Sequence, residues 1–193
     1  MTMDQGRDHD RNQDRPPGPL WIFAYGSLMW QPDFDVLETR PATLFGYHRG
    51  LCIYSNTYRG TPAALGLVFG LDRGGSCKGM ALRIAEDRAD AVMAKVWNRE
   101  MVTKVYRPRW LTAHVAGRPV TVWTFVADRD HAQYAGRPND AETIRLIRQG
   151  HGTGGACVDY VVSTHAHLKT CGIYDRALAR VVRQLDTPVS PAG

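Results

Sequence analysis

The chain has 193 residues, of which 44% are hydrophobic and 22% charged, which is enough to bury the core of one globular domain. Its formal net charge is +5, and this composition excludes an acidic disordered chain, a collagen and a coiled coil. Only four of the 24 basic residues are lysines, and no block of five or more basic residues occurs, so the charge does not favour nucleic-acid binding. Because arginine binds carboxylates and phosphates in a bidentate way, we expect a small anionic ligand.

Charge and proline dominate the first 20 residues, which we expect to form a disordered tail. We predict a single folded domain over residues 21–185 and a C-terminal tail over 186–193. The start of the chain lacks the apolar region of a signal peptide, and no apolar stretch is long enough to cross a membrane. The four cysteines form no C-x-x-C pair, so we expect reduced thiols, no bound metal and a cytoplasmic protein.

The predicted elements follow one another as strands, one helix, strands and then helices. We expect a strand at the start of WIFAYGSLMW, a hairpin over 65–84 that turns at Gly74-Gly75, and a second hairpin that turns at Gly117. The remaining predicted elements are a strand over 42–58 and helices over 86–99, 139–149, 156–170 and 174–185. This order does not alternate as in a doubly wound sheet. It predicts an α+β fold with a mixed, mostly antiparallel sheet curled into a small barrel with flanking helices.

The first candidate for a functional site is the Tyr25-Gly26-Ser27-Leu28 turn, which follows the apolar strand directly. A strand that runs into a Gly-Ser turn exposes consecutive backbone N–H groups, which suit a carboxylate or a phosphate. Such turns are common in proteins, so a purely structural turn remains the alternative on this pattern alone.

The second candidate is Glu100. It continues the helical stripe of Met93 and Val96 and would therefore point inward. A carboxylate on an apolar face is costly unless it is paired or used in chemistry, and burial raises its pKa toward neutrality. The alternative is that the helix ends by Arg99 and that Glu100 is solvated.

The third candidate is the glycine-rich stretch over 60–79, where close backbone contacts and tight turns are expected. Its GGSC sequence includes Cys77, which would be the nucleophile of a cysteine-dependent hydrolase. No histidine lies near Cys77 in the sequence, so this pattern leaves that reading as an alternative only.

Taken together, these segments resemble the ChaC-like γ-glutamylcyclotransferases. The resemblance rests on WIFAYGSLMW, on GTP followed by GLVFGLDRGGSCKGMALRI, on NRE at 98–100, on YRPRWL, and on YAGRP followed by IRLIRQGHGTGGACVDYV. It covers roughly residues 20–183, and the order of the pieces is far more specific than any one of them.

The resemblance implies roles for individual residues. Glu100, which follows an arginine at the end of the first long helix, takes the place of the family's catalytic glutamate. The YGSL turn takes the place of the segment that holds the α-amino and α-carboxylate ends of a γ-glutamyl group. The residues that the resemblance assigns to substrate binding are Tyr25, Gly26, Ser27, Leu28, Tyr160, Arg49 and Tyr106.

The activity implied by the resemblance is the cyclisation of a γ-glutamyl group, with glutathione as the expected small-molecule partner and without a cofactor, a nucleic acid or a membrane. The products would be 5-oxoproline and cysteinylglycine. The segment YSNTYRGTP departs from the string of the glutathione-specific members at Ser55, Asn56, Thr57 and Tyr58, which bears on the choice of substrate. The alternative is a γ-glutamyl-binding regulatory protein without turnover.

Overall fold

The computed structural model describes residues 15–187, which form two compact units. The barrel unit holds the described residues up to Arg49 together with Leu71–Asp128. The helical unit holds Gly50–Gly70 and the described residues from Arg129 onward. The sequence prediction of one folded domain over 21–185 stays a prediction.

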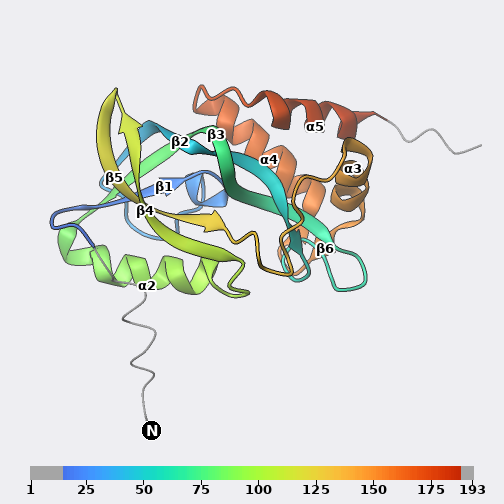
Figure 1. Cartoon of the computed structure of the whole chain (residues 1–193), viewed down its shortest axis with the longest axis horizontal. Helices are drawn as coiled ribbons and strands as arrows, with labels where there is room; N and C mark the ends of the chain where they lie inside the picture. Colours follow the sequence, from blue (N-terminus) through green and yellow to red (C-terminus); the bar gives the residue numbers. More distant parts are fainter. Residues whose placement is uncertain (1–14, 188–193) are drawn as a thin grey trace, which may run out of the picture. The chain divides into compact units, whose positions relative to one another are not determined.

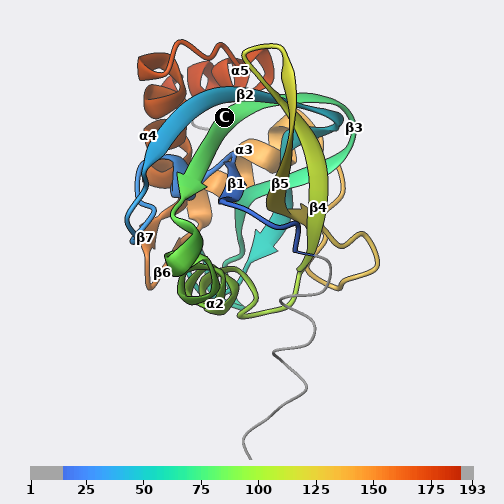
Figure 2. The same cartoon turned by 90° about the vertical axis from the view of Figure 1, so that its left-hand side faces the viewer.

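Five strands close into a barrel in the order β1-β3-β2-β4-β5 (Figure 2). Their bounds are β1 Leu20–Ala24, β2 Glu38–Ser55, β3 Gly66–Ile84, β4 Tyr106–Val115 and β5 Arg118–Ala127. β1 pairs antiparallel with β3, with Leu20 opposite Ile84, and parallel with β5, where Ile22 lies opposite Trp123. The β1–β3, β2–β4 and β4–β5 pairings are antiparallel, and the predicted α+β class with a curled, mostly antiparallel sheet is confirmed.

The core of the barrel unit draws on both faces of some strands, because consecutive residues of β1 and of β5 are buried although their side chains point to opposite faces. The largest fully buried ones include Ile22, Leu44, Leu82 and Trp123. A short helix η2 (Glu86–Arg88) leads into α2 (Ala89–Glu100), whose buried face is formed by Ala89, Val92, Met93 and Val96. The predicted helix over 86–99 is therefore a single turn of 3-10 helix followed by an α-helix that ends one residue later.

The helical unit contains α3 (Asp140–Gln149), α4 (Cys157–Thr170) and α5 (Arg176–Asp186), which contact one another (Figure 1). A two-stranded hairpin of β6 (His151–Gly152) and β7 (Gly155–Ala156) connects α3 to α4. The capping signal at Asn139 is confirmed, since its side chain accepts a hydrogen bond from the Glu142 amide at 2.9 Å. Leu146, Ile147, Val161 and Leu168 are buried where these helices pack.

The hairpin predicted over 65–84 is wrong, because β3 runs through this region as one strand of 19 residues. Gly74 and Gly75 have φ angles of +102° and +72°, and they place a bend within the strand instead of reversing it. The part beyond them pairs with β1, and Leu71 pairs with Val126 of β5. The sequence thus located the special backbone correctly but not its consequence for chain direction.

The ends of the chain bear on the predicted tails. β1 begins at Leu20, and Arg15 forms an ion pair with Asp90 at 2.7 Å. The predicted tail residues 1–14 and 188–193 lie outside the described part of the chain. No helix within residues 15–187 has the combination of length and apolar composition that crossing a membrane requires.

Candidate active site

The predicted turn follows β1 directly and continues as the short helix η1 (Ser27–Met29). Within this helix the Met29 amide donates to the Gly26 carbonyl at 2.9 Å, so the amides of Ser27 and Leu28 precede the first helical hydrogen bond. The Tyr25 side chain is buried, and its hydroxyl donates to the Phe125 carbonyl at 3.0 Å. Barrel strands therefore hold the start of the turn in a fixed place.

Close packing of β3 against the end of β1 also fixes the position from which the turn starts. A Cβ atom added to Gly79 would lie 2.4 Å from the Ala24 carbonyl oxygen and 2.8 Å from the Phe23 ring. Only a glycine allows the two strands to approach so closely here. The glycine-rich stretch predicted over 60–79 therefore has a structural purpose at this position.

Arg49, one of the predicted binding residues, is buried in the barrel unit with only 8% of its surface exposed. Its Nε donates to the Tyr25 carbonyl at 2.6 Å, and one terminal nitrogen donates to the Lys78 carbonyl at 2.7 Å. A buried guanidinium needs such partners, because an uncompensated buried charge is expensive. These contacts show Arg49 holding the backbone of the turn, and its contact with a substrate stays a prediction.

Glu100 is the last residue of α2, and its side chain is 18% exposed. The helix extends through it, and the Met101 amide closes the end by donating to the Trp97 carbonyl at 2.8 Å. The alternative of a solvated Glu100 after the end of the helix is therefore wrong. As the spacing from Met93 and Val96 predicts, the carboxylate lies on the less exposed side of the helix end.

Burial raises the pKa of the Glu100 carboxyl above its ordinary value, and the nearby positive charge of Arg99 offsets part of this rise. The Arg99 Nε atom lies 3.6 Å from a Glu100 carboxylate oxygen, which is ion-pair distance but longer than a good hydrogen bond. A carboxyl with a raised pKa exchanges protons more readily near neutral pH, as a general acid–base group must.

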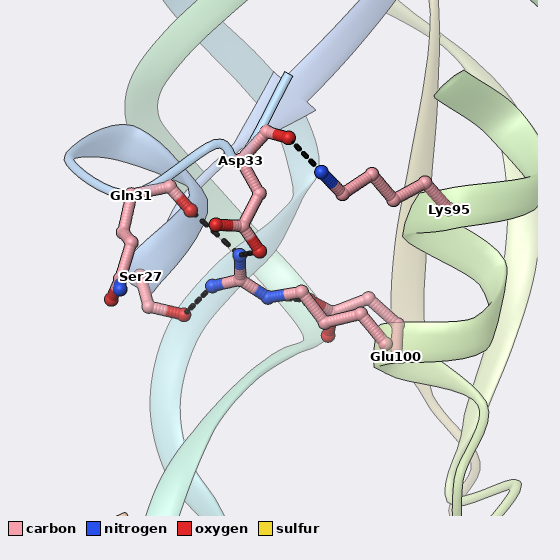
Figure 3. Close-up of polar contacts among 6 residues, drawn as sticks. Ser27, Gln31, Asp33, Lys95 and Glu100 are labelled. Carbon is pink, nitrogen blue, oxygen red and sulfur yellow. Dashed lines mark hydrogen bonds and ion pairs between the residues drawn. The ribbon is translucent and has the colours of Figure 1, made fainter. Parts of the chain in front are cut away.

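Arg99 joins the end of α2 to the turn after β1. Its terminal nitrogens donate to the Ser27 hydroxyl at 2.9 Å and to the Gln31 carbonyl at 2.6 Å, and one of them lies 3.4 Å from the Asp33 carboxylate. Figure 3 shows Ser27, Gln31 and Asp33 facing the end of the helix that carries Glu100. One side chain thus connects the predicted ligand-binding turn with the predicted catalytic carboxylate.

A second contact between the loop and α2 involves Lys95, whose ammonium donates to the Asp33 carbonyl (Figure 3). Asp33 has a φ angle of +61°, a left-handed conformation that aspartate tolerates better than most residues. Sequence reasoning missed Gln31, Asp33 and Lys95 and quoted Arg99 only as part of the NRE motif. No local pattern signals these contacts, because they join segments about 65 residues apart.

The two remaining predicted binding residues are Tyr106 and Tyr160. Tyr106 is half-buried at the first position of β4, opposite Ala127. Tyr160 lies on α4 in the helical unit, where its hydroxyl accepts a hydrogen bond from the Phe69 amide at 3.4 Å. The Arg59 guanidinium lies 5.2 Å from the centre of the Tyr160 ring. For both tyrosines a role in substrate binding stays a prediction.

The geometry does not favour a cysteine nucleophile or a metal site. Cys77 is 2% exposed, and its thiol lies 3.7 Å from the Lys78 carbonyl oxygen, which is the environment of a structural thiol. Within residues 15–187 no group of three or more His, Cys, Asp or Glu side chains has the arrangement of a metal site. The features that converge are therefore the turn, Arg99 and Glu100.

The barrel has the fold of known γ-glutamylcyclotransferase structures. A yeast γ-glutamylcyclotransferase specific to glutathione superposes with a TM-score of 0.81 at 19% identity, covering 87% of this chain and 96% of the yeast chain. The chain belongs to the ChaC-like protein family, which matches residues 20–187.

Two relatives of known name are similar over most of the chain. The glutathione-specific γ-glutamylcyclotransferase of Escherichia coli K12 is 34% identical over 162 residues, which cover 83% of this chain and 70% of the relative. The human glutathione-specific γ-glutamylcyclotransferase 1 is 26% identical over 181 residues, which cover 90% of this chain and 82% of the relative. These matches confirm the family that the sequence motifs indicated.

Proposed function

We propose that this chain is a γ-glutamylcyclotransferase that acts on glutathione and releases 5-oxoproline and cysteinylglycine. The observation that carries the proposal is a mostly buried glutamate with a raised pKa, joined through Arg99 to the turn after β1. The names of the E. coli, human and yeast relatives support glutathione as the substrate.

In the proposed reaction the nucleophile belongs to the substrate. The α-amino nitrogen attacks the γ-carbonyl carbon, a five-membered lactam forms, and the bond from that carbon to the amide nitrogen breaks. The attacking nitrogen starts as an ammonium and ends as a lactam N–H, so it loses two protons. The leaving nitrogen gains two protons and departs as the ammonium group of the released amine, so atoms and charge balance.

Glu100 is the group that we propose moves a proton between the two nitrogens. As a carboxylate it accepts a proton from the attacking nitrogen, and as a carboxylic acid it donates that proton to the leaving nitrogen. General acid–base catalysis of this kind contributes about 10²–10⁴-fold to a rate. Its raised pKa suits both directions of transfer, because a strong acid would hold no proton to return.

The turn would bind and orient the substrate. The amides of Ser27 and Leu28 precede the first hydrogen bond of η1, and we propose that they bind the α-carboxylate of the γ-glutamyl group. Holding the chain of the substrate in a folded shape brings amine and carbonyl together, and such positioning is worth roughly 7–11 kcal/mol in favourable cases. We also propose the cytoplasm as the compartment, because all four cysteines are free thiols.

The test is release of 5-oxoproline by the purified protein from glutathione and, separately, from γ-glutamyl-alanine. We expect turnover of glutathione by the wild type and a loss of about 10²–10⁴-fold in Glu100→Gln, which keeps the shape but cannot carry the proton. Glu142→Gln is the matched control, because Glu142 is an exposed partner of Arg145 on α3, and it should retain full activity.

Each other outcome has a definite meaning. Full activity in Glu100→Gln would disprove the assignment of the base. Preference for γ-glutamyl-alanine would keep the reaction and replace the substrate. Binding of glutathione by the wild type without any 5-oxoproline would favour the regulatory alternative.

A further inference from the structure

We propose that Arg99 is a positioning residue that fixes the Ser27 hydroxyl as a hydrogen-bond donor to the bound γ-glutamyl group. This inference rests on the proposed function and adds a specific polar contact to it. The contact would be made by a side chain, in addition to the backbone amides of the turn.

The Arg99 and Ser27 side chains differ in their capacity for hydrogen bonding. A guanidinium only donates hydrogen bonds, whereas a hydroxyl has one hydrogen to donate and lone pairs to accept. Arg99 donates to the Ser27 oxygen at 2.9 Å, so the hydroxyl hydrogen must point away from the guanidinium. In the described part of the chain, the structure shows no acceptor for that hydrogen.

The Arg99 side chain is itself well fixed. It is 26% exposed, and it bonds to the Gln31 carbonyl at 2.6 Å and pairs with the Asp33 carboxylate at 3.4 Å. Because the guanidinium is planar and its donors are rigidly spaced, these partners determine its orientation. The Ser27 hydroxyl therefore keeps its proton directed away from a guanidinium that is itself held in place by Gln31 and Asp33 (Figure 3).

The position of Ser27 connects this direction to the substrate. It is the first residue of η1, and its amide belongs to the same end of the turn that we propose binds the α-carboxylate. A carboxylate is an acceptor-only group, so it matches a hydroxyl that is held as a donor. Hydrogen bonds to a charged group are stronger than those between neutral groups.

The experiment is a double-mutant cycle of Arg99→Lys and Ser27→Ala, read as the Kd of glutathione in a Glu100→Gln background that prevents turnover. Lysine keeps the positive charge beside residue 100, but its single ammonium cannot contact all the partners of the guanidinium. We expect each single change to raise Kd about tenfold. The double variant should also be raised only about tenfold, because both changes remove the same contact.

Arg40→Lys is the matched control, because Arg40 pairs with Glu38 on the surface of the same unit and should leave Kd unchanged. In the wild-type background, Arg99→Lys should raise KM about tenfold and change kcat by less than about threefold. A merely structural role of Arg99 would lower kcat and thermal stability together instead.

Several results would overturn the inference. An additive cycle, with Kd raised about 100-fold in the double variant, would show that Arg99 does not act through Ser27. An unchanged Kd in Ser27→Ala would show that the hydroxyl does not contact the ligand. If wild-type protein turns over glutathione while either result is found, only this inference fails. If glutathione is neither bound nor converted, the proposed function fails with it.

Discussion

Two arginines, one in each unit, anchor loops in different ways. Arg59 in the helical unit donates to the carbonyls of Gly154 and Ala156 within the β6–β7 hairpin and lies over the Tyr160 ring. Arg99 in the barrel unit donates to a hydroxyl and a carbonyl and lies beside two carboxylates, those of Asp33 and Glu100.

The two arginines differ in the chemistry of their partners. The Arg59 guanidinium donates to two backbone carbonyls, and these contacts hold the hairpin in place. Arg99 has ionisable and hydroxyl partners that retain donors or exchangeable protons. For these two arginines, the chemistry of the partners therefore says more about a functional role than the burial of the guanidinium does.

The largest effect on stability is expected at Glu100. Its pKa is raised in the folded protein, first by burial, so the folded state binds the proton more tightly than the unfolded state. The free energy of unfolding should therefore fall as pH rises from the ordinary carboxyl pKa of 4.5 toward the higher pKa of the folded state. Glu100→Gln removes this loss, and we expect it to be more stable than the wild type at pH 7.

The measurement is urea unfolding of both proteins at pH 7 and at pH 4. The gain in Glu100→Gln should shrink at pH 4, where the wild-type carboxyl is largely protonated in both the folded and the unfolded state. A variant that is less stable than the wild type at pH 7 would mean that Arg99 stabilises the Glu100 carboxylate by more than burial costs. In that case the contacts of Arg99, like those of Arg59, would mainly stabilise the fold.

Parts of the fold and of the candidate site were predictable from the sequence because their signals are local. The spacing of Met93, Val96 and Glu100 fixes one side of a helix, and the Asn139–Glu142 pair predicts a cap that the structure contains. Such patterns depend only on helix geometry. The family motifs added the association of the YGSL turn with Glu100, which local periodicity does not contain.

The remainder depended on contacts between distant segments. The bend at Gly74-Gly75 reads as a hairpin turn in the sequence, and only the pairing of β3 with β1 and β5 shows that the strand continues. Likewise, no local sequence pattern around Ser27 predicts its hydrogen bond with Arg99, which lies 72 residues away. Pairing between strands and the reach of long side chains decide such contacts, and neither has a local pattern.

The second effect in size is expected at Arg59. Arg59→Met keeps most of the length of the side chain but leaves the Gly154 and Ala156 carbonyls without this donor and removes the contact with the Tyr160 ring. We expect a loss of about 2 kcal/mol in the free energy of unfolding. Arg183→Met, an exposed position on α5, is the matched control and should change stability by less than about 0.5 kcal/mol.

Chemical denaturation of the two variants measures this difference, and glutathione turnover per folded molecule measures its consequence. If Arg59 has only its structural contacts, turnover of the folded fraction should match the wild type. A loss of turnover in a fully folded Arg59→Met protein would give Arg59 a functional role and remove the contrast with Arg99.

The smallest effect is expected in Tyr160→Phe, which tests the residue that the family resemblance assigns to the site. Its hydroxyl accepts from the Phe69 amide at a long 3.4 Å, so losing it should cost about 1 kcal/mol of stability or less. The ring itself stays, and with it the contacts with Phe69 and Arg59. Kinetics separate the two possible roles of the hydroxyl: an unchanged KM and kcat for glutathione would make Tyr160 a packing residue. A rise in KM at unchanged thermal stability would mean that its oxygen contacts the substrate.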